Sequence, residues 1–194
     1  KHVLSKSTFI RGLQCEKSLY LNKFHRDLKD KISTEQQHIF NRGNKVGVLA
    51  QQLFGQGKDA TPANYWDFSN ALRMTQEWIQ QGEKIIFEAA FQHAGVLVAL
   101  DVLVFVNGKY YAYEVKSAGR VSHTYIRDAA LQNWVIEQSG IKIEDFFIVH
   151  IDTSYTKTGE LEVRELFKKQ TVKDQIQEQQ EEIGLKIAEL ELVL

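Results

Sequence analysis

A predicted β-hairpin between Val96 and Lys116 constrains this chain more than any other feature of its sequence. The segment that begins at Val96 is apolar and rich in β-branched residues until Asn107-Gly108 interrupts it. A second strand pattern then runs to Lys116. Asn-Gly between two such segments is the strongest short-range signal for a two-residue hairpin turn. The sequence therefore predicts two paired antiparallel strands here.

The turn fixes the register of the hairpin. With Asn107-Gly108 as the loop, Val106 faces Lys109, and the same register places Asp101 opposite Glu114. Side chains alternate along a strand, so Lys116 shares the face of Glu114. Directly opposed residues have Cβ atoms about 4.5–5.5 Å apart, and like charges at that distance destabilise a sheet.

A shared divalent cation would remove the repulsion between Asp101 and Glu114. Mg²⁺ prefers oxygen ligands and usually takes one or two protein carboxylates. Asp101 interrupts an otherwise apolar strand, and a charge there is costly unless it is paired or binds a metal. We therefore interpret the pair as a metal site, with Lys116 available for an anionic substrate or a nucleophilic water. The alternatives are a protonated, hydrogen-bonded carboxylate pair or a shifted register that separates the two groups.

Composition indicates an ordinary globular protein. Charged residues make up 25% of the 194 residues and hydrophobic residues 43%. No stretch approaches the ~20 apolar residues of a transmembrane helix, and no signal-peptide pattern opens the chain. A single cysteine permits no internal disulfide, so we expect a cytoplasmic protein without a membrane partner. The net charge is −1, but the first part of the chain is basic, which suits a phosphate backbone or a solvated helix face equally well.

The pattern along the chain predicts one domain over residues 1–194. Within it we expect a helical N-terminal part (1–81), a core of strands and a helix (82–152) and a C-terminal helix (about 171–192). The expected elements are helices from Ser5 or Ser7 to about Phe24, 34–54, 69–80, 122–139 and 172–192, a loop over 55–67, and strands at 84–91, 96–106, 109–116, 146–151 and 161–166. Along the chain, the expected order is helices, then three consecutive strands, then a helix and a strand. This order predicts an α/β fold with a mixed central sheet flanked by helices. The chain starts with Lys1 and has one methionine, so we expect it to be part of a longer protein.

The charged residues of the hairpin resemble a known nuclease pattern. Asp101 followed by Glu114-Val115-Lys116 is similar to the acidic-then-E-X-K motif of the PD-(D/E)XK nuclease superfamily. Glu88 lies on the preceding strand, where these nucleases often carry another acidic residue. Gln132, in the next predicted helix, resembles the glutamine motif of the RecB-type branch. The resemblance implies a restriction-endonuclease-like α/β/α core.

Two N-terminal segments resemble the CRISPR-associated RecB-like exonucleases. Residues 4–9 with Cys15 are similar to their opening, and residues 42–47 to their second helix motif. Gly47 stands where RecB-type enzymes usually have a metal-binding histidine, and His38, His93 or His123 would have to compensate. The iron–sulfur cluster of the related exonucleases needs four cysteines, so we expect no cluster in this chain. Cys15 is then either a ligand of a 4Fe–4S cluster completed in a longer protein or a buried small hydrophobe.

The resemblance implies an exonuclease-like deoxyribonuclease that depends on Mg²⁺ or Mn²⁺. Its expected substrates are single-stranded DNA or duplex ends, and its expected role is DNA repair, recombination or defence. A fused C-terminal domain or a helicase is the expected protein partner. The site residues it implies are Asp101, Glu114, Lys116 and Gln132 for catalysis, and Asp101, Glu114 and Glu88 for the metal. Candidates for nucleic-acid contact are Lys6, Arg120, Tyr125 and Arg127. The alternatives are a catalytically silent module that binds nucleic acid or acts as a scaffold, and a hydrolase acting on another phosphate ester.

Overall fold

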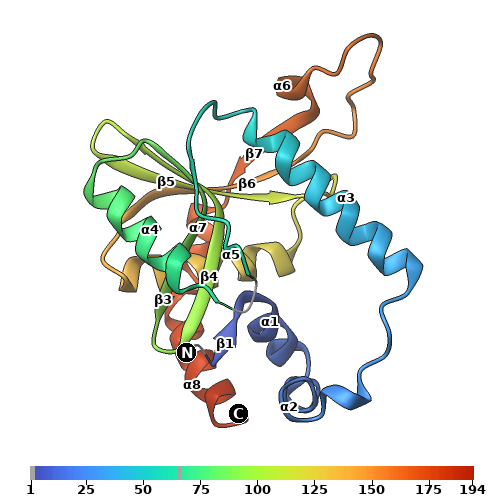
Figure 1. The fold of residues 1–194 in the computed structure, drawn as a ribbon, viewed down its shortest axis with the longest axis vertical. Coiled ribbons are helices and arrows are strands. Elements are labelled where there is room, and N and C mark those ends of the chain that lie inside the picture. The colour runs from blue at the N-terminus through green and yellow to red at the C-terminus, as the bar shows by residue number, and fades with distance from the viewer. Residues whose placement is uncertain (1–2, 65–66) are drawn as a thin grey trace.

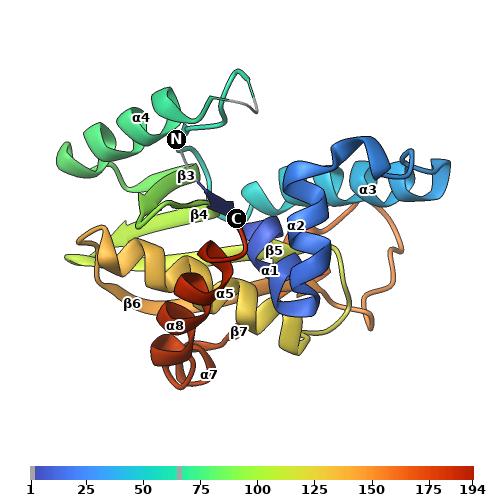
Figure 2. The ribbon, with the colours of Figure 1, turned by 90° about the horizontal axis from the view of Figure 1, so that it is seen from below.

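The computed structural model describes residues 3–64 and 67–194 as a mixed β-sheet with helices on both faces (Figures 1 and 2). The strands are β1 (Leu4–Ser5), β2 (Lys58–Asp59), β3 (Ile85–His93), β4 (Val96–Val106), β5 (Lys109–Lys116), β6 (Ile143–Ile151) and β7 (Phe167–Thr171). The helices are α1 (Lys6–Gln14), α2 (Glu16–Phe24), α3 (Thr34–Gln51), α4 (Ser69–Gln80), α5 (His123–Gln138), α6 (Val163–Leu166), α7 (Lys173–Gln177) and α8 (Gln180–Glu191), with a 3₁₀ helix, η1 (Arg26–Leu28). The expected α/β fold class, a mixed sheet flanked by helices, is confirmed.

The sheet has the order β2-β3-β4-β5-β6-β7, and β1 pairs with β4 off this path. β4 pairs antiparallel with β3 and with β5, whereas the pairs β1–β4, β2–β3 and β5–β6 are parallel. The parallel strands β5 and β6 are connected through α5. β7 pairs antiparallel with β6 and forms one edge. A parallel pair needs such a crossover connection, and a helix is the usual one.

The hairpin has the predicted turn and register. Asn107 and Gly108 both have positive φ, 50° and 77°, as a type I′ turn requires. Val106 pairs with Lys109, and the ladder continues to Val102 opposite Tyr113. The turn chemistry therefore fixes which β4 and β5 side chains meet.

The two faces of β5 are covered by different helices. Lys116 is paired with Asp128 of α5, whereas Tyr113 and Val115 pack in the cluster that contains Val46 of α3. Figure 2 shows α5 and α8 on the side of the sheet opposite to α4. This alternation places Glu114 and Lys116 on the face of the sheet that α5 covers.

Two predicted helices are broken in the structure. The N-terminal one divides at Cys15, whose backbone is extended, and α2 then packs back against α1. A Cβ at Gly12 would lie 2.7 Å from a methyl group of Leu190, so the glycine permits close contact with α8. The C-terminal one divides after α7, where the side-chain amide of Gln180 donates to the Ile176 carbonyl over 3.0 Å and takes the place of a helical N–H.

The edge strand predicted at 161–166 is wrong. That segment contains the helical turn α6, and the edge strand β7 follows it. Val163 and Leu166 both pack in the cluster beneath α3. Their spacing places them on one side of a helical turn, whereas a strand would place them on opposite faces. The predicted loop over 55–67 contains the two-residue strand β2, and its residues 65–66 lie outside the described residues.

Across residues 3–64 and 67–194, no helix has the length and apolar character needed to cross a lipid bilayer.

Glu88 carries backbone strain inside β3. Its φ is 52°, a left-handed conformation that a side chain with a Cβ adopts only at a cost. The β3–β4 ladder pairs Phe87 with Val102 and Ala89 with Leu100, but not Glu88 with Asp101. The strain thus coincides with the point where a carboxylate of β3 approaches a carboxylate of β4.

Replacing Glu88 separates the strain from the charge. Glu88→Gln removes the charge and keeps the strained Cβ, whereas Glu88→Gly removes both. Since left-handed backbone costs about 1–3 kcal/mol and glycine loses about 0.5–1 kcal/mol more conformational freedom, we expect Glu88→Gly to be about 1 kcal/mol more stable than Glu88→Gln. Urea unfolding of the two variants measures this difference. Equal stability, or a more stable glutamine variant, would contradict the strain.

Candidate functional site

The candidate site lies where the pairing between β4 and β5 ends. Tyr113 of β5 pairs with Val102, the last pair of the β4–β5 ladder, while β1 pairs with β4 only at Val96 and Leu97. Because β3 occupies the other edge of β4, residues 98–101 have no strand partner on the edge between β1 and β5. β5 continues beyond this point beside β6. The divergence of β4 from β5 opens a gap in the sheet.

Asp101 bridges the two diverging strands. It stands one position beyond the last β4–β5 pair, and its Oδ2 accepts a hydrogen bond from the backbone N–H of Val115. The side chain thus replaces a backbone acceptor that the departing strand no longer provides. The predicted register brings Asp101 and Glu114 to the same place, although the backbone ladder ends just before them.

Glu114 is buried between two lysines. Its side chain is 2% exposed, and its Oε1 accepts from Lys6 Nζ and Lys116 Nζ, each at 2.7 Å. Its other oxygen, Oε2, is buried without a hydrogen-bond partner among the described residues. A carboxylate buried to this degree requires compensating charge, and the two ammonium groups provide it.

Helix α5 holds Lys116 from the opposite side. Asp128 Oδ2 accepts from Lys116 Nζ at 2.6 Å, and the Gln132 amide lies 3.4 Å from Asp128 Oδ1. Asp128 and Gln132 are one helical turn apart and share a face. Ser122 caps the helix by accepting from the Tyr125 N–H, which sets where that face begins. Gln132 is fully buried, and its Oε1 has no partner among the described residues.

Asp128 is the site residue that sequence reasoning missed. It stands four positions before Gln132, and no role is predicted for it from the sequence. Its signal was a charged residue at the start of a run of small and apolar side chains, Ala129-Ala130-Leu131. Since charged residues are almost never fully buried unless paired, such a position calls for a cationic partner. Here that partner is Lys116.

The charged groups of the cluster shift one another's pKa values. Burial, and then repulsion by Glu114, raises the pKa of Asp101 to about 8, and burial raises the pKa of Glu88 to about 7. Burial alone would raise the pKa of Glu114 as well, but Lys116 and Lys6 outweigh it and lower that pKa to about 2. Both lysines have raised pKa values because attraction by Glu114 and Asp128 exceeds their own cost of burial. One permanently charged carboxylate is thus surrounded by two that resist ionisation.

The donor chemistry suits a divalent cation held by few protein ligands. Four carboxylates, those of Glu88, Asp101, Glu114 and Asp128, face two ammonium groups, so two negative charges remain to be balanced when all are ionised. The unpartnered Oε2 of Glu114 is a free oxygen donor. Among the residues that the structure describes, no group of three or more His, Cys, Asp or Glu side chains is arranged to hold one ion. Glu88 lies close enough to raise the pKa of Asp101, and Glu114 in turn raises the pKa of Glu88. The role of Glu88 as a metal ligand stays a prediction.

Within the described residues, the three histidines that could compensate for Gly47, namely His38, His93 and His123, form no hydrogen bond or ion pair with Asp101, Glu114 or Asp128. A Cβ at Gly47 would meet no atom within 4 Å, so α3 leaves open space there. His38 and His123 are exposed, and the His93 ring packs against Trp134 with centroids 5.4 Å apart.

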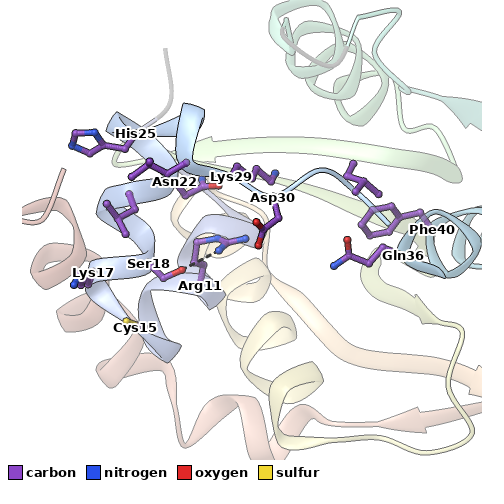
Figure 3. A pocket seen from close by; sticks show the side chains of 13 residues that line it. Arg11, Cys15, Lys17, Ser18, Asn22, His25, Lys29, Asp30, Gln36 and Phe40 are labelled. Atoms are coloured by element: carbon purple, nitrogen blue, oxygen red, sulfur yellow. Dashed lines mark hydrogen bonds between the residues drawn. The ribbon is translucent and has the colours of Figure 1, made fainter. Parts of the chain in front are cut away.

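Cys15 is exposed, so the alternative that it is a buried hydrophobe is wrong. It lines a cleft of about 630 Å³ together with Arg11, Ser18, His25 and Phe40 (Figure 3). Arg11 donates to the Ser18 hydroxyl across 3.0 Å in its wall. None of the clustered carboxylates lines this cleft.

The candidates for nucleic-acid contact are divided between two environments. Lys6 lies inside the charged cluster, where it pairs with Glu114. The Tyr125 ring lies 5.3 Å from Lys116 Nζ and so borders the cluster. Arg120 and Arg127 are exposed.

The raised pKa of Asp101 predicts how the stability of the metal-free protein changes with pH. In the unfolded chain this group titrates near its ordinary pKa of 3.8, and in the fold near 8. Between these values the folded state binds more protons, so the free energy of unfolding falls as pH rises from about 4 to about 8. Asp101→Asn keeps an oxygen for the Val115 N–H but cannot ionise. We expect it to unfold at higher urea concentration than wild type at pH 8.5 in EDTA, and at a similar concentration at pH 5.

Asp27→Asn, at an exposed position, is the control and should follow wild type at both pH values. If Asp101→Asn gains no stability over wild type between pH 5 and pH 8.5, the pKa of Asp101 is not raised in the folded protein.

No protein-family model matches this chain, and no curated protein matches it. Among solved structures it is similar to an alkaline exonuclease (LHK-Exo) from Laribacter hongkongensis, with 17% identity and a TM-score of 0.37 over 84% of this chain and 83% of that one. It is also similar to a protein named SSO0001, with 12% identity and a TM-score of 0.40 over 94% of this chain and 75% of that one.

Proposed function

We propose that this chain is a metal-dependent deoxyribonuclease that hydrolyses phosphodiester bonds at Asp101, Glu114 and Lys116. The observation that carries the proposal is the buried cluster in the gap between β4 and β5. It holds more carboxylates than ammonium groups and leaves an oxygen of Glu114 unpartnered. Natural proteins maintain such an arrangement at a cost in stability, and strongly shifted groups of this kind concentrate at functional sites.

Asp101 and Glu114 would hold Mg²⁺ or Mn²⁺, with water and substrate oxygens completing the coordination. When bound, the ion would lower the pKa of a water and stabilise negative charge on the phosphate. Glu88, the third predicted ligand, would add negative charge close to the ion. Asp101 must lose its proton before it can act as a ligand, so metal binding would strengthen as pH rises toward 8.

Lys116 would act on the phosphate or on the attacking water. An ammonium group has three N–H donors, and Glu114 and Asp128 take two of those of Lys116. The third is free to donate to a phosphate oxygen or to orient the water. Asp128, with Gln132 behind it, fixes the direction of that donor, so Asp128 is a positioning residue.

The DNA would approach over exposed residues near the cluster. Arg120 and Arg127 suit phosphate contacts, and Tyr125 borders Lys116. Lys6 would reach a phosphate only after leaving Glu114. The proposal also includes the substrate, which would be single-stranded DNA or duplex ends. It further includes a cytoplasmic location, a role in repair, recombination or defence, and a helicase or fused C-terminal domain as partner. A 4Fe–4S cluster completed in a longer protein through Cys15 is part of it as well.

One observation favours a second candidate, a silent module that binds nucleic acid without cutting it. Lys6 and Lys116 both occupy Oε1 of Glu114, and no set of three metal-type side chains forms within the described parts of the chain. Together with Gly47 on α3, this arrangement would suit a nuclease fold that has lost a ligand. The two candidates differ in whether DNA is cut in the presence of Mg²⁺ or Mn²⁺.

Replacing Lys116 tests the catalytic proposal. We expect Lys116→Ala to reduce cleavage of labelled single- and double-stranded DNA by ~10²-fold or more in Mn²⁺ or Mg²⁺, the scale of losing one donor to transition-state charge. Manganese affinity should change only a few-fold, because Lys116 is not a ligand and, held by Asp128 as well, does not have to leave its place when the metal binds. Stability should also fall, since Glu114 loses one partner and Asp128 is left unpaired.

The control is Lys109→Ala on the same strand, whose exposed ion pair with Glu144 lies away from the cluster and which should cut like wild type. EDTA should abolish cleavage in every variant. If wild type binds DNA but cuts none with either metal, the silent-module candidate replaces the nuclease.

A further inference from the structure

Within the described part of the chain, Lys6 is the one member of the charged cluster that comes from β1 or α1. It is the first residue of α1 and follows β1 directly. Its ammonium lies 2.7 Å from Glu114 Oε1 and 3.5 Å from the carbonyl oxygen of Ala99, in the gap beside β4. Attraction by Glu114, Asp128 and Asp101 outweighs the cost of its burial. It therefore occupies a place that suits a cation.

The fold does not need this ion pair to position α1. Ser5 caps the helix through a reciprocal pair of hydrogen bonds with Thr8, and β1 pairs with Val96 and Leu97 of β4. Phe9 anchors the helix in the core with no exposed surface. The backbone at Lys6 is thus held independently of its side chain.

The side chain of Lys6 is also free to leave. It remains 28% exposed, whereas the Lys116 side chain is 17% exposed and is held by two carboxylates. A lysine is a point charge on a flexible four-carbon stem, so it can reorient without moving the helix. Glu114 would retain Lys116 after Lys6 departs.

We propose that the ammonium of Lys6 is an internal substitute for the metal, and that a divalent cation displaces it from Glu114. This inference rests on the proposed metal site. The displaced Lys6 remains at the open side of the cluster, where a DNA phosphate would approach. Lys6 thereby sets the affinity for the metal, because part of the binding free energy is used to break the Lys6–Glu114 pair.

Calorimetric titration of Mn²⁺ into the metal-free protein tests the competition. Lys6→Met keeps an unbranched side chain and removes the charge, so we expect it to bind Mn²⁺ about tenfold or more tightly than wild type. Lys23→Met is the matched control, since the Lys23 ammonium donates to the Val3 carbonyl over 3.2 Å and not to a carboxylate of the cluster, so the affinity should stay unchanged.

A second measurement uses the unaltered chain, in case Lys6→Met folds poorly. Amine-reactive labelling followed by mass spectrometry reports how accessible each lysine is. Mn²⁺ should raise the labelling rate of Lys6 several-fold and leave that of Lys23 unchanged.

The outcomes separate this inference from the proposed function. If Mn²⁺ binds wild type and Lys6→Met equally, or wild type more tightly, and Lys6 labelling does not rise, Lys6 is not a substitute cation although the metal site stands. If neither variant binds Mn²⁺, both the metal site and the competition are wrong.

Discussion

The divergence of β4 from β5 at Asp101 is the feature on which the rest of the site depends. A continuous sheet would satisfy its backbone groups by ladder hydrogen bonds and leave no room for charge. Here the ladder ends at Val102, and the Asp101 carboxylate takes over as acceptor for Val115. Leaving a buried charge without any partner typically costs about 3–5 kcal/mol, so Glu114, once buried in the gap, requires at least one cation beside it.

The site unites segments that are distant in sequence. Lys6 comes from the N-terminal helix, Asp101 and Glu114 from the hairpin, and Asp128 from α5. Figure 1 shows β1 and α1 beside β4, so the N-terminal segment is part of the same unit as the sheet. Binding at the cluster would consequently be sensitive to changes in α1, even though this helix contributes no carboxylate.

Local chemistry explains what the sequence could predict. The Asn107-Gly108 turn determines the register of β4 and β5, and from it follows the proximity of Asp101 and Glu114. The pairing of Lys6 with Glu114, and of Lys116 with Asp128, depends on how helices pack on the sheet, which no local pattern encodes. The sequence therefore predicts nucleic-acid contact for Lys6, whereas the structure pairs it with Glu114. The strain at Glu88 likewise arises from tertiary structure, because no turn residue marks it.

The central claim is that Asp101 and Glu114 together bind one divalent cation. Electron paramagnetic resonance of free Mn²⁺ measures this directly, by titrating the metal into wild type and into a double variant carrying Asp101→Asn and Glu114→Gln. The account predicts that wild type removes one equivalent of Mn²⁺ from solution, that the double variant removes none at the same concentrations, and that Asp27→Asn matches wild type. Equal binding by wild type and the double variant would contradict the claim, since the ion would then be held elsewhere.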